Sequence, residues 1–332
     1  MEFFYSISLK LLRFFPAEFA SKISLNSLKF LFKFSPFVIR NKKKYSNIHF
    51  KYENMHFKNY LGIAAGLDKE GIYFPAIGSL GFGFVEVGTF TPQPQKGNEY
   101  PRLKRIIESE SLINRLGFNN PGILKGSINI EKYRNRYSGI LGVSIGKNKQ
   151  TKLEDAYKDY IFCLNVCYGI SDYIAINISS PNTEGLRELS NEVYFNDLLS
   201  QINISRNILI KKFKKKVPLF LKLSPDESEE NLDFILNKSI ENNISGFIVS
   251  NTMKGKYGGL EGGISGEKLK KTSLNFLKKV NSVIKKDALL ISSGGISSKK
   301  DIEERMDNGA DLMQIYTSFV YKGPSIINEL LN

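Results

Sequence analysis

The sequence is poor in the residues that build metal centres and disulfide frameworks. Its 332 residues include two cysteines, two histidines and no tryptophan. Cys163 and Cys167 are four residues apart, so they share one face of an expected helix but form neither a CxxC redox motif nor a zinc motif. We therefore expect two buried free thiols, a reducing compartment and no metal site. His49 and His56 lie beside lysines in a strand-like stretch at 49–57, and we expect them at the surface.

Long uncharged hydrophobic runs are also missing. No segment approaches the roughly 20 apolar residues that a membrane-spanning helix requires, and no secretory cleavage site follows a hydrophobic core. Residues 1–44 are instead basic and aromatic, and their pattern predicts two short amphipathic helices at 5–14 and 22–34. Helices of this kind lie in a membrane interface. The alternative is that they only pack on the main domain.

Acidic residues are scarce relative to basic ones. The chain has 47 lysines and arginines against 33 aspartates and glutamates, a formal net charge of +14. The lysines are spread along the whole chain, and no RNA-binding or helix-turn-helix signature accompanies them, so we expect no nucleic-acid partner. The basic run at 211–216 is most simply a solvated helix end.

The chain after residue 44 has the rhythm of an α/β protein. Short apolar runs alternate with longer helical patterns, as in a parallel sheet covered by helices. The eight runs are 61–65, 84–87, 140–145, 173–178, 219–223, 247–249, 289–291 and 312–316. Eight such units predict a (β/α)8 TIM barrel over residues 45–332, preceded by a small N-terminal helical extension at 1–44. The long segment between 87 and 140 should form a lid or wall over the site.

The richest group of polar residues follows the fourth predicted strand. Asn177, Ser180 and Asn182 crowd its carboxyl end, which is where α/β enzymes keep their chemistry. An asparagine offers both a donor and an acceptor, so two of them can bind the edge of a planar ring, with the serine oxygen between them. A simple turn requires fewer polar residues than this run contains.

Other strand ends point to a phosphorylated cofactor. Lys69 follows small residues after the first strand, and Lys222 lies inside the fifth, where a buried charge marks a ligand site. Gly294 and Gly295 follow the seventh strand and Thr317 the eighth, the positions where barrel enzymes hold a phosphate. No G-x-G-x-x-G motif opens a helix, so a nicotinamide site is not indicated.

Five segments together resemble the dihydroorotate dehydrogenases, and in particular their quinone-linked, membrane-associated class (class 2). They are 64–69, 114–119, 146–149, 177–183 and 316–317, and the resemblance covers roughly residues 1–330. Two features indicate the class: Ser180 stands where the soluble class has a cysteine, and the soluble class lacks the basic, aromatic N-terminal extension.

The resemblance implies the oxidation of (S)-dihydroorotate to orotate in de novo pyrimidine (UMP) biosynthesis, with Ser180 as the catalytic base. FMN would contact Ala65, Gly66, Lys69, Thr89, Ser144, Asn177, Lys222, Ser250, Gly266, Gly295, Tyr316 and Thr317. The substrate would contact Lys69, Asn114, Arg115, Leu116, Gly117, Phe118, Asn177, Asn182, Asn251 and Thr252. Arg105 and Tyr316 would line a quinone tunnel. The family usually has asparagine at position 144, where this sequence has Ser144. The connection from Asn251 to Gly262 is short beside that of many relatives, so we expect a trimmed lid there.

The resemblance also implies a location and an electron acceptor. Ubiquinone or menaquinone would accept the electrons, and the protein would lie peripherally on the cytoplasmic side of the cell membrane, docked through residues 1–44. One rival is a soluble relative that uses fumarate, or a nicotinamide through a partner subunit. A second is a barrel without chemistry that only binds a membrane surface or nucleic acid. Ser180 and the N-terminal extension argue against the first, and the intact polar residues argue against the second.

Overall fold

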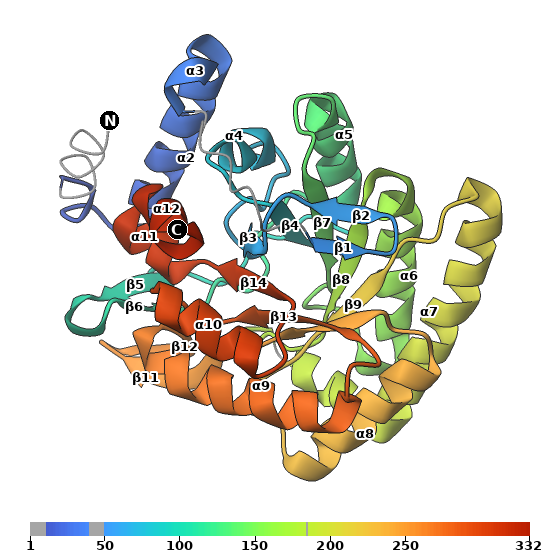
Figure 1. Ribbon diagram of the computed structural model, residues 1–332. Coiled ribbons are helices and arrows are strands. Elements are labelled where there is room, and N and C mark those ends of the chain that lie inside the picture. Colours follow the sequence, from blue (N-terminus) through green and yellow to red (C-terminus); the bar gives the residue numbers. More distant parts are fainter. Residues whose placement is uncertain (1–10, 40–49, 184) are drawn as a thin grey trace.

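A closed barrel of eight parallel strands forms the centre of the protein (Figure 1). The computed structural model describes residues 11–39, 50–183 and 185–332. In the closed sheet the neighbouring strands run in the order β10-β13-β14-β3-β4-β7-β8-β9. Their bounds are β3 Leu61–Ile63, β4 Phe84–Phe90, β7 Ile140–Ile145, β8 Tyr173–Asn177, β9 Leu219–Lys222, β10 Gly246–Val249, β13 Leu289–Ser293 and β14 Leu312–Ile315. Each predicted apolar run overlaps one of these strands, so the predicted (β/α)8 barrel is confirmed.

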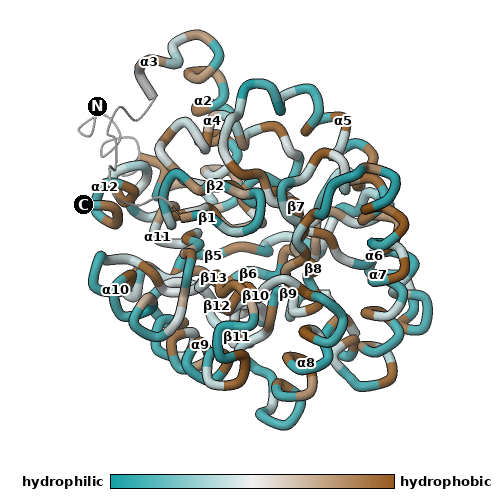
Figure 2. Tube along the Cα trace, turned by 45° about the vertical axis from the view of Figure 1, so that its right-hand side comes forward, coloured by the Kyte–Doolittle hydropathy of each residue, from teal (hydrophilic) through white to brown (hydrophobic). Residues whose placement is uncertain are grey.

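Helices surround the barrel and supply the outer half of its core. They are α4 Phe74–Ser79, α5 Ile123–Arg134, α6 Ala156–Cys167, α7 Glu192–Phe213, α8 Glu229–Glu241, α9 Lys270–Ile284, α10 Lys299–Asp307, α11 Thr317–Lys322 and α12 Ser325–Leu331. Short 3-10 turns occur at Ile107–Ser109, Leu153–Asp155, Tyr168–Ile170, Leu186–Ser190 and Glu267–Leu269. In Figure 2 the outward parts of the helices are mainly hydrophilic, whereas the central strands carry hydrophobic residues. The apolar sides of the helices therefore face the sheet.

Two sequence expectations about these helices are confirmed. Cys163 and Cys167 are buried free thiols on α6, and burial raises the pKa of the Cys167 thiol to about 12. The basic run at 211–216 begins in the last turn of α7, and most of its residues are exposed.

A hairpin closes the amino-terminal end of the barrel. Its strands are β1 Phe50–Tyr52 and β2 Met55–Phe57, which pair antiparallel where the sequence suggested one strand-like stretch. Phe57 is 1% exposed and packs edge-on against Phe84, with ring centroids 5.4 Å apart. His56 is exposed, as expected, and His49 lies outside the described residues.

A second sheet lies over the carboxyl end of the barrel. Its four antiparallel strands are β5 Leu103–Ile106, β6 Ser111–Asn114, β11 Met253–Tyr257 and β12 Leu260–Gly266, in the order β11-β12-β6-β5. The predicted lid segment between 87 and 140 thus supplies half of this sheet. The connection after Asn251, expected to be trimmed, supplies the other half. Gly262 allows β12 to approach β6 closely, because a Cβ there would lie 2.2 Å from the Asn114 carbonyl oxygen.

The N-terminal helix both packs on the barrel and presents aromatic residues to solvent. Helix α2 spans Ala17–Phe34, beginning five residues before the predicted 22–34, and α3 spans Pro36–Ile39. On one side, Leu25 is buried in the main core and Glu18 forms an ion pair with Arg102 at 2.6 Å.

The opposite side of α2 remains uncovered. Phe30 and Phe34 are 62% and 60% exposed. One side of α2 therefore packs on the main domain and another exposes aromatic residues, and the binding of this helix to a membrane interface stays a prediction. Of the other predicted helix, 5–14, residues 5–10 lie outside the described part, and the chain is helical at 11–12 before it turns. Among the described residues, no helix combines the length and hydrophobicity needed to span a membrane.

Candidate active site

A cavity lies between the carboxyl ends of the barrel strands and the second sheet. It brings together most of the residues that the sequence singled out, from both ends of the chain. Those that line it are Ala65, Gly66, Lys69, Thr89, Asn114, Leu116, Gly117, Phe118, Asn177, Ser180, Asn182, Lys222, Ser250, Asn251, Thr252, Gly266, Gly295, Tyr316 and Thr317. The structure thus collects nearly the whole predicted set on one surface.

Three predicted site residues lie elsewhere. Ser144 is fully buried behind the cavity wall, and its hydroxyl shares a 2.9 Å hydrogen bond with Thr89. Arg115 does not line the cavity although both of its neighbours do, and its backbone carbonyl accepts a hydrogen bond from Asn98 at 2.9 Å. Arg105 donates to the backbone carbonyls of Leu12 and Phe15, at 3.3 Å and 2.8 Å, and so holds the chain that precedes α2.

Hydrogen bonds fix the amide groups at the cavity floor. Asn177 donates to Thr89 Oγ1 at 3.2 Å, and its own Oδ1 accepts from the backbone N–H of Ser179 at 3.2 Å. Asn251 follows β10, which is separated from β8 by β9 in the barrel, and it donates to Ser179 Oγ at 3.0 Å. The amides that follow β8 and β10 therefore form one network, which sets their orientation before any ligand binds.

The loop after β8 carries Ser180 at the edge of this network. Ser180 is 6% exposed, and its Oγ accepts a hydrogen bond from the backbone N–H of Asn182 at 3.3 Å. Arg187 anchors the loop: it donates to the carbonyls of Ser179 and Thr252 at 3.2 Å and 3.3 Å and pairs with Asp226 at 2.7 Å. Arg187 could not be identified from the sequence, because no motif distinguishes it from a surface arginine.

Lys222 has a buried carboxylate partner inside the barrel. Its Nζ lies 3.7 Å from Glu86 Oε1, and the two side chains are 7% and 0% exposed. Tyr173 and Gln314 each donate to Glu86 Oε2 at 2.9 Å, which leaves Oε1 facing the lysine. Sequence reasoning missed Glu86, although a glutamate within the apolar run 84–87 was the available signal.

Lys69 places a second cation at the cavity wall. The preceding residue, Asp68, is buried and accepts hydrogen bonds from four backbone N–H groups at residues 71–74, so the loop after β3 is rigid. Lys69 donates to Asn119 Oδ1 at 2.9 Å. Burial lowers the pKa of Lys69 to about 8, so its ammonium group is still charged at neutral pH and suits an anionic ligand.

The glycine loop after β13 can approach a ligand closely. Gly294 and Gly295 have φ angles of +105° and +72°, and a Cβ on Gly295 would lie 2.4 Å from the Cα of Lys270. A Cβ on Gly266, which also lines the cavity, would lie 2.8 Å from Thr317 Cγ2. Side chains are therefore excluded here, which leaves backbone N–H groups to face a phosphate.

A second cavity adjoins the first beneath α2. Its volume is about 690 Å³, and its lining includes Phe19 and Leu25 from the helix. The two cavities share Gly66, Lys69 and Tyr316 in their walls. Burial raises the pKa of Tyr316 to about 12, so its hydroxyl stays neutral at physiological pH. An apolar molecule entering under α2 would thus reach the wall of the first cavity.

These features define a (β/α)8-barrel enzyme whose cavity suits a phosphorylated cofactor and a small anionic substrate. Comparison with known proteins agrees. The sequence model of the family described as dihydroorotate dehydrogenase matches residues 47–332. The chain therefore belongs to the dihydroorotate dehydrogenase family, within its quinone-linked class.

Two curated relatives support the class. The dihydroorotate dehydrogenase (quinone) of Serratia proteamaculans is 44% identical over 283 residues, covering 83% of this chain and 84% of the relative. That of Aliivibrio salmonicida is 39% identical over 323 residues, 95% of each chain. A crystal structure of DHODH from Eimeria tenella in complex with ferulenol is similar with a TM-score of 0.86 at 29% identity, and the match covers 93% of this chain and 89% of that one.

The Glu86–Lys222 pair leads to a prediction about stability. Glu86→Gln or Lys222→Met alone should lower the free energy of unfolding by about 3–5 kcal/mol, because each leaves one buried charge uncompensated. The double variant should lose less than the sum of the two, since neither charge remains. Urea unfolding of the flavin-free protein measures all three, and strict additivity would contradict the pairing. Lys238→Met, which breaks the exposed pair with Glu241, is the control and should cost below about 1 kcal/mol.

Proposed function

We propose that this protein oxidises (S)-dihydroorotate to orotate, with FMN as the hydride acceptor and a membrane quinone as the final electron acceptor. The observation that carries the proposal is the meeting of Ser180, Lys69, Lys222 and the glycine loop around one cavity. The reaction is a step of de novo pyrimidine biosynthesis, the pathway to UMP.

The residues of the cavity fit FMN. The Gly294–Gly295 loop and Thr317 would hold its phosphate, because the two glycines leave backbone amides uncovered after β13 and Thr317 brings a hydroxyl and the first turn of α11 after β14. Gly66, Thr89 and Lys222 would surround the flavin ring. Ser144 would act on the flavin through Thr89, to which it is hydrogen-bonded. When bound, FMN supplies the acceptor for a hydride.

The protein's own groups suit the other half of the chemistry. Lys69 would bind the substrate carboxylate, and the amides of Asn177 and Asn251 would hold the edge of the pyrimidine ring. Ser180 Oγ would accept the proton from C5 of dihydroorotate while its own hydroxyl proton passes to a threonine hydroxyl or to water, because a neutral serine hydroxyl is a weak base. Lys222 would stabilise negative charge that develops at the cavity floor.

We further propose that residues 1–44 dock the protein on the cytoplasmic side of the cell membrane. Aromatic residues exposed on α2 lie beside basic ones, as in helices that bind an interface. The second cavity opens beneath this helix and ends at Tyr316, so it offers ubiquinone or menaquinone a passage toward the flavin. Arg105 remains a predicted polar group of this passage. Arg105 does not line the second cavity, but its contacts with Leu12 and Phe15 support a role close to α2.

The reaction can be tested by mixing the purified protein with dihydroorotate in the absence of oxygen. The flavin absorbance should bleach and then recover on addition of a ubiquinone analogue. Ser180→Ala should slow the bleaching by about 10²–10⁴-fold, the contribution of a general base. Recovery with fumarate and not with a quinone would contradict the acceptor, and absence of flavin or of bleaching would contradict the reaction.

The lowered pKa of Lys69 predicts a pH dependence of substrate binding. The charged ammonium predominates below pH 8 and is lost above it, so the affinity for orotate should fall about tenfold between about pH 7 and pH 9. Orotate titrations followed by the flavin spectrum measure this affinity. The variant Lys69→Met should bind orotate weakly at both pH values, and an unchanged pH dependence in this variant would contradict the assignment.

The exposed aromatic face of α2 predicts a membrane-binding defect. Phe30→Gln combined with Phe34→Gln should abolish binding to vesicles and quinone turnover on them, because these side chains lose the favourable burial in the interface. Reduction of the flavin by dihydroorotate should be unchanged. The matched control is Leu124→Gln with Ile128→Gln on α5, a pair that is 54% and 57% exposed. Equal loss of vesicle binding in both double variants would contradict docking through α2.

A further inference from the structure

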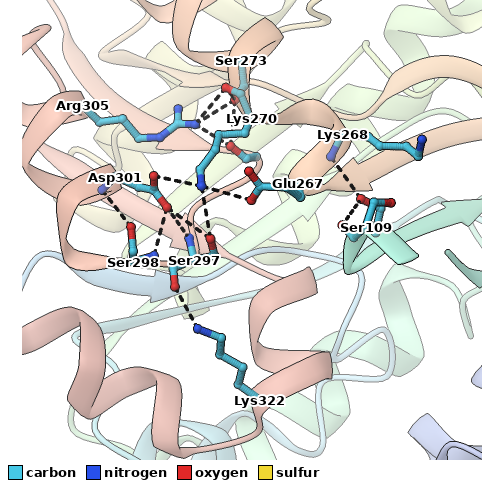
Figure 3. Close-up of polar contacts among 12 residues, drawn as sticks. Ser109, Glu267, Lys268, Lys270, Ser273, Ser297, Ser298, Asp301, Arg305 and Lys322 are labelled. Atoms are coloured by element: carbon cyan, nitrogen blue, oxygen red, sulfur yellow. Dashed lines mark hydrogen bonds and ion pairs between the residues drawn. The ribbon is translucent and has the colours of Figure 1, made fainter. Parts of the chain in front are cut away.

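The glycine loop after β13 is held from behind by a buried arginine. Arg305 lies in the last turn of α10 and is 1% exposed. Its guanidinium donates to Ser292 Oγ and Ser273 Oγ at 2.9 Å each and to the Gly294 carbonyl oxygen at 2.6 Å. Figure 3 shows the guanidinium directed toward Ser273, on the inner side of α9.

The positive charge of Arg305 is not neutralised by direct contact. All of its hydrogen-bond partners are neutral, and within the described residues it forms no ion pair. Burial lowers its pKa to about 10, so it remains protonated at neutral pH. Taking a guanidinium out of water without a carboxylate partner is costly. A bound anion on the other side of the loop would offset that cost.

The contact with Gly294 also sets the direction of a peptide group. The carbonyl of Gly294 and the N–H of Gly295 belong to the same peptide, and in a trans peptide they point in opposite directions. The carbonyl points to Arg305 and Ser273, so the N–H of Gly295 points away from them. Gly294 and Gly295 both line the cavity, so this donor is directed to the position expected for a phosphate.

The far end of the loop is fixed separately. Asp301 accepts hydrogen bonds from the backbone N–H groups of Ser297 and Ser298 at 2.9 Å each and pairs with Lys270 at 3.1 Å (Figure 3). Lys322 donates to the Ser297 carbonyl at 3.1 Å. Lys270 also pairs with Glu267 at 3.0 Å, and Lys322 pairs with Glu329 at 3.1 Å, so Arg305 is the cation of this group that contacts no carboxylate among the described residues.

We propose that Arg305 is a positioning residue for the phosphate group of the cofactor: it orients the Gly294–Gly295 peptide and supplies positive potential through it. The protein should therefore discriminate a phosphorylated flavin from one without phosphate by means of a residue that touches neither. This inference rests on the proposed function, in which FMN occupies this cavity.

The test compares FMN with riboflavin, which has the same ring and no phosphate. Flavin-free protein is titrated with each, and binding is followed by the quenching of flavin fluorescence. The wild type should prefer FMN strongly. Arg305→Met should weaken FMN binding by about tenfold to a hundredfold, the range for a hydrogen bond to a charged group, and leave riboflavin affinity unchanged. Arg305→Lys keeps the charge and should lose less.

Two further variants separate this role from a general packing role. Ser273→Ala removes a neutral hydroxyl that also donates to the Gly294 carbonyl, at 2.7 Å, and should lower FMN affinity several-fold without affecting riboflavin. This variant decides the matter if Arg305→Met does not fold. Arg206 is also buried, at 2% exposure, and donates to the Asn243 carbonyl, but it lies outside the cavity lining. Arg206→Met should therefore leave the preference for FMN unchanged.

The outcomes are distinguishable. Equal loss of FMN and riboflavin in Arg305→Met and Ser273→Ala, or full retention of the FMN preference, would overturn the role of Arg305 and leave the proposed function standing. Wild-type protein that binds no FMN would overturn the proposed function, and this inference with it.

Discussion

The buried ion pair between Glu86 and Lys222 is the interaction around which the barrel interior is organised. The two charges come from β4 and β9, on different sides of the closed sheet, and Tyr173 and Gln314 add contacts from β8 and β14. Below this polar layer, Phe57 and Phe84 belong to an apolar cluster closed by the β1–β2 hairpin. Above it lies the cavity. The pair thus marks the boundary between a barrel half that serves stability and a half that binds ligands.

Much of the fold could be predicted from the sequence because its signals are local. Buried parallel strands are short apolar runs, and each of the eight could be recognised without knowledge of the others. The second sheet could not be predicted in this way. Its central pairing joins Gly263 to Asn114, residues far apart in the chain, and nothing in either segment specifies the other. The β1–β2 hairpin was missed for a simpler reason, since each of its strands has only three residues.

The candidate site likewise combines residues that could be predicted from the sequence with residues that only the structure reveals. Lys222 and the asparagines could be predicted because polar residues in or after apolar strands are conspicuous. Their partners could not, because Arg187 and Arg305 lie on helical segments rich in other charged residues. Ser144 illustrates a related limit: the sequence predicts that it lies near the cofactor, but only the structure shows Thr89 between it and the cavity. Sequence reasoning identifies side chains that face a ligand more readily than those that hold them in place.

Closure of the barrel has a consequence for the order of events during synthesis. The sheet closes by pairing β3 with β14, the first and last barrel strands in the chain, in the register Leu61 to Met313. Contacts between such distant segments form slowly and require nearly the whole chain. Tyr316 and Thr317, which complete the cavity, follow β14 directly. A nascent chain therefore cannot complete this cavity until β14 and the two residues that follow it have been synthesised and can pair with β3.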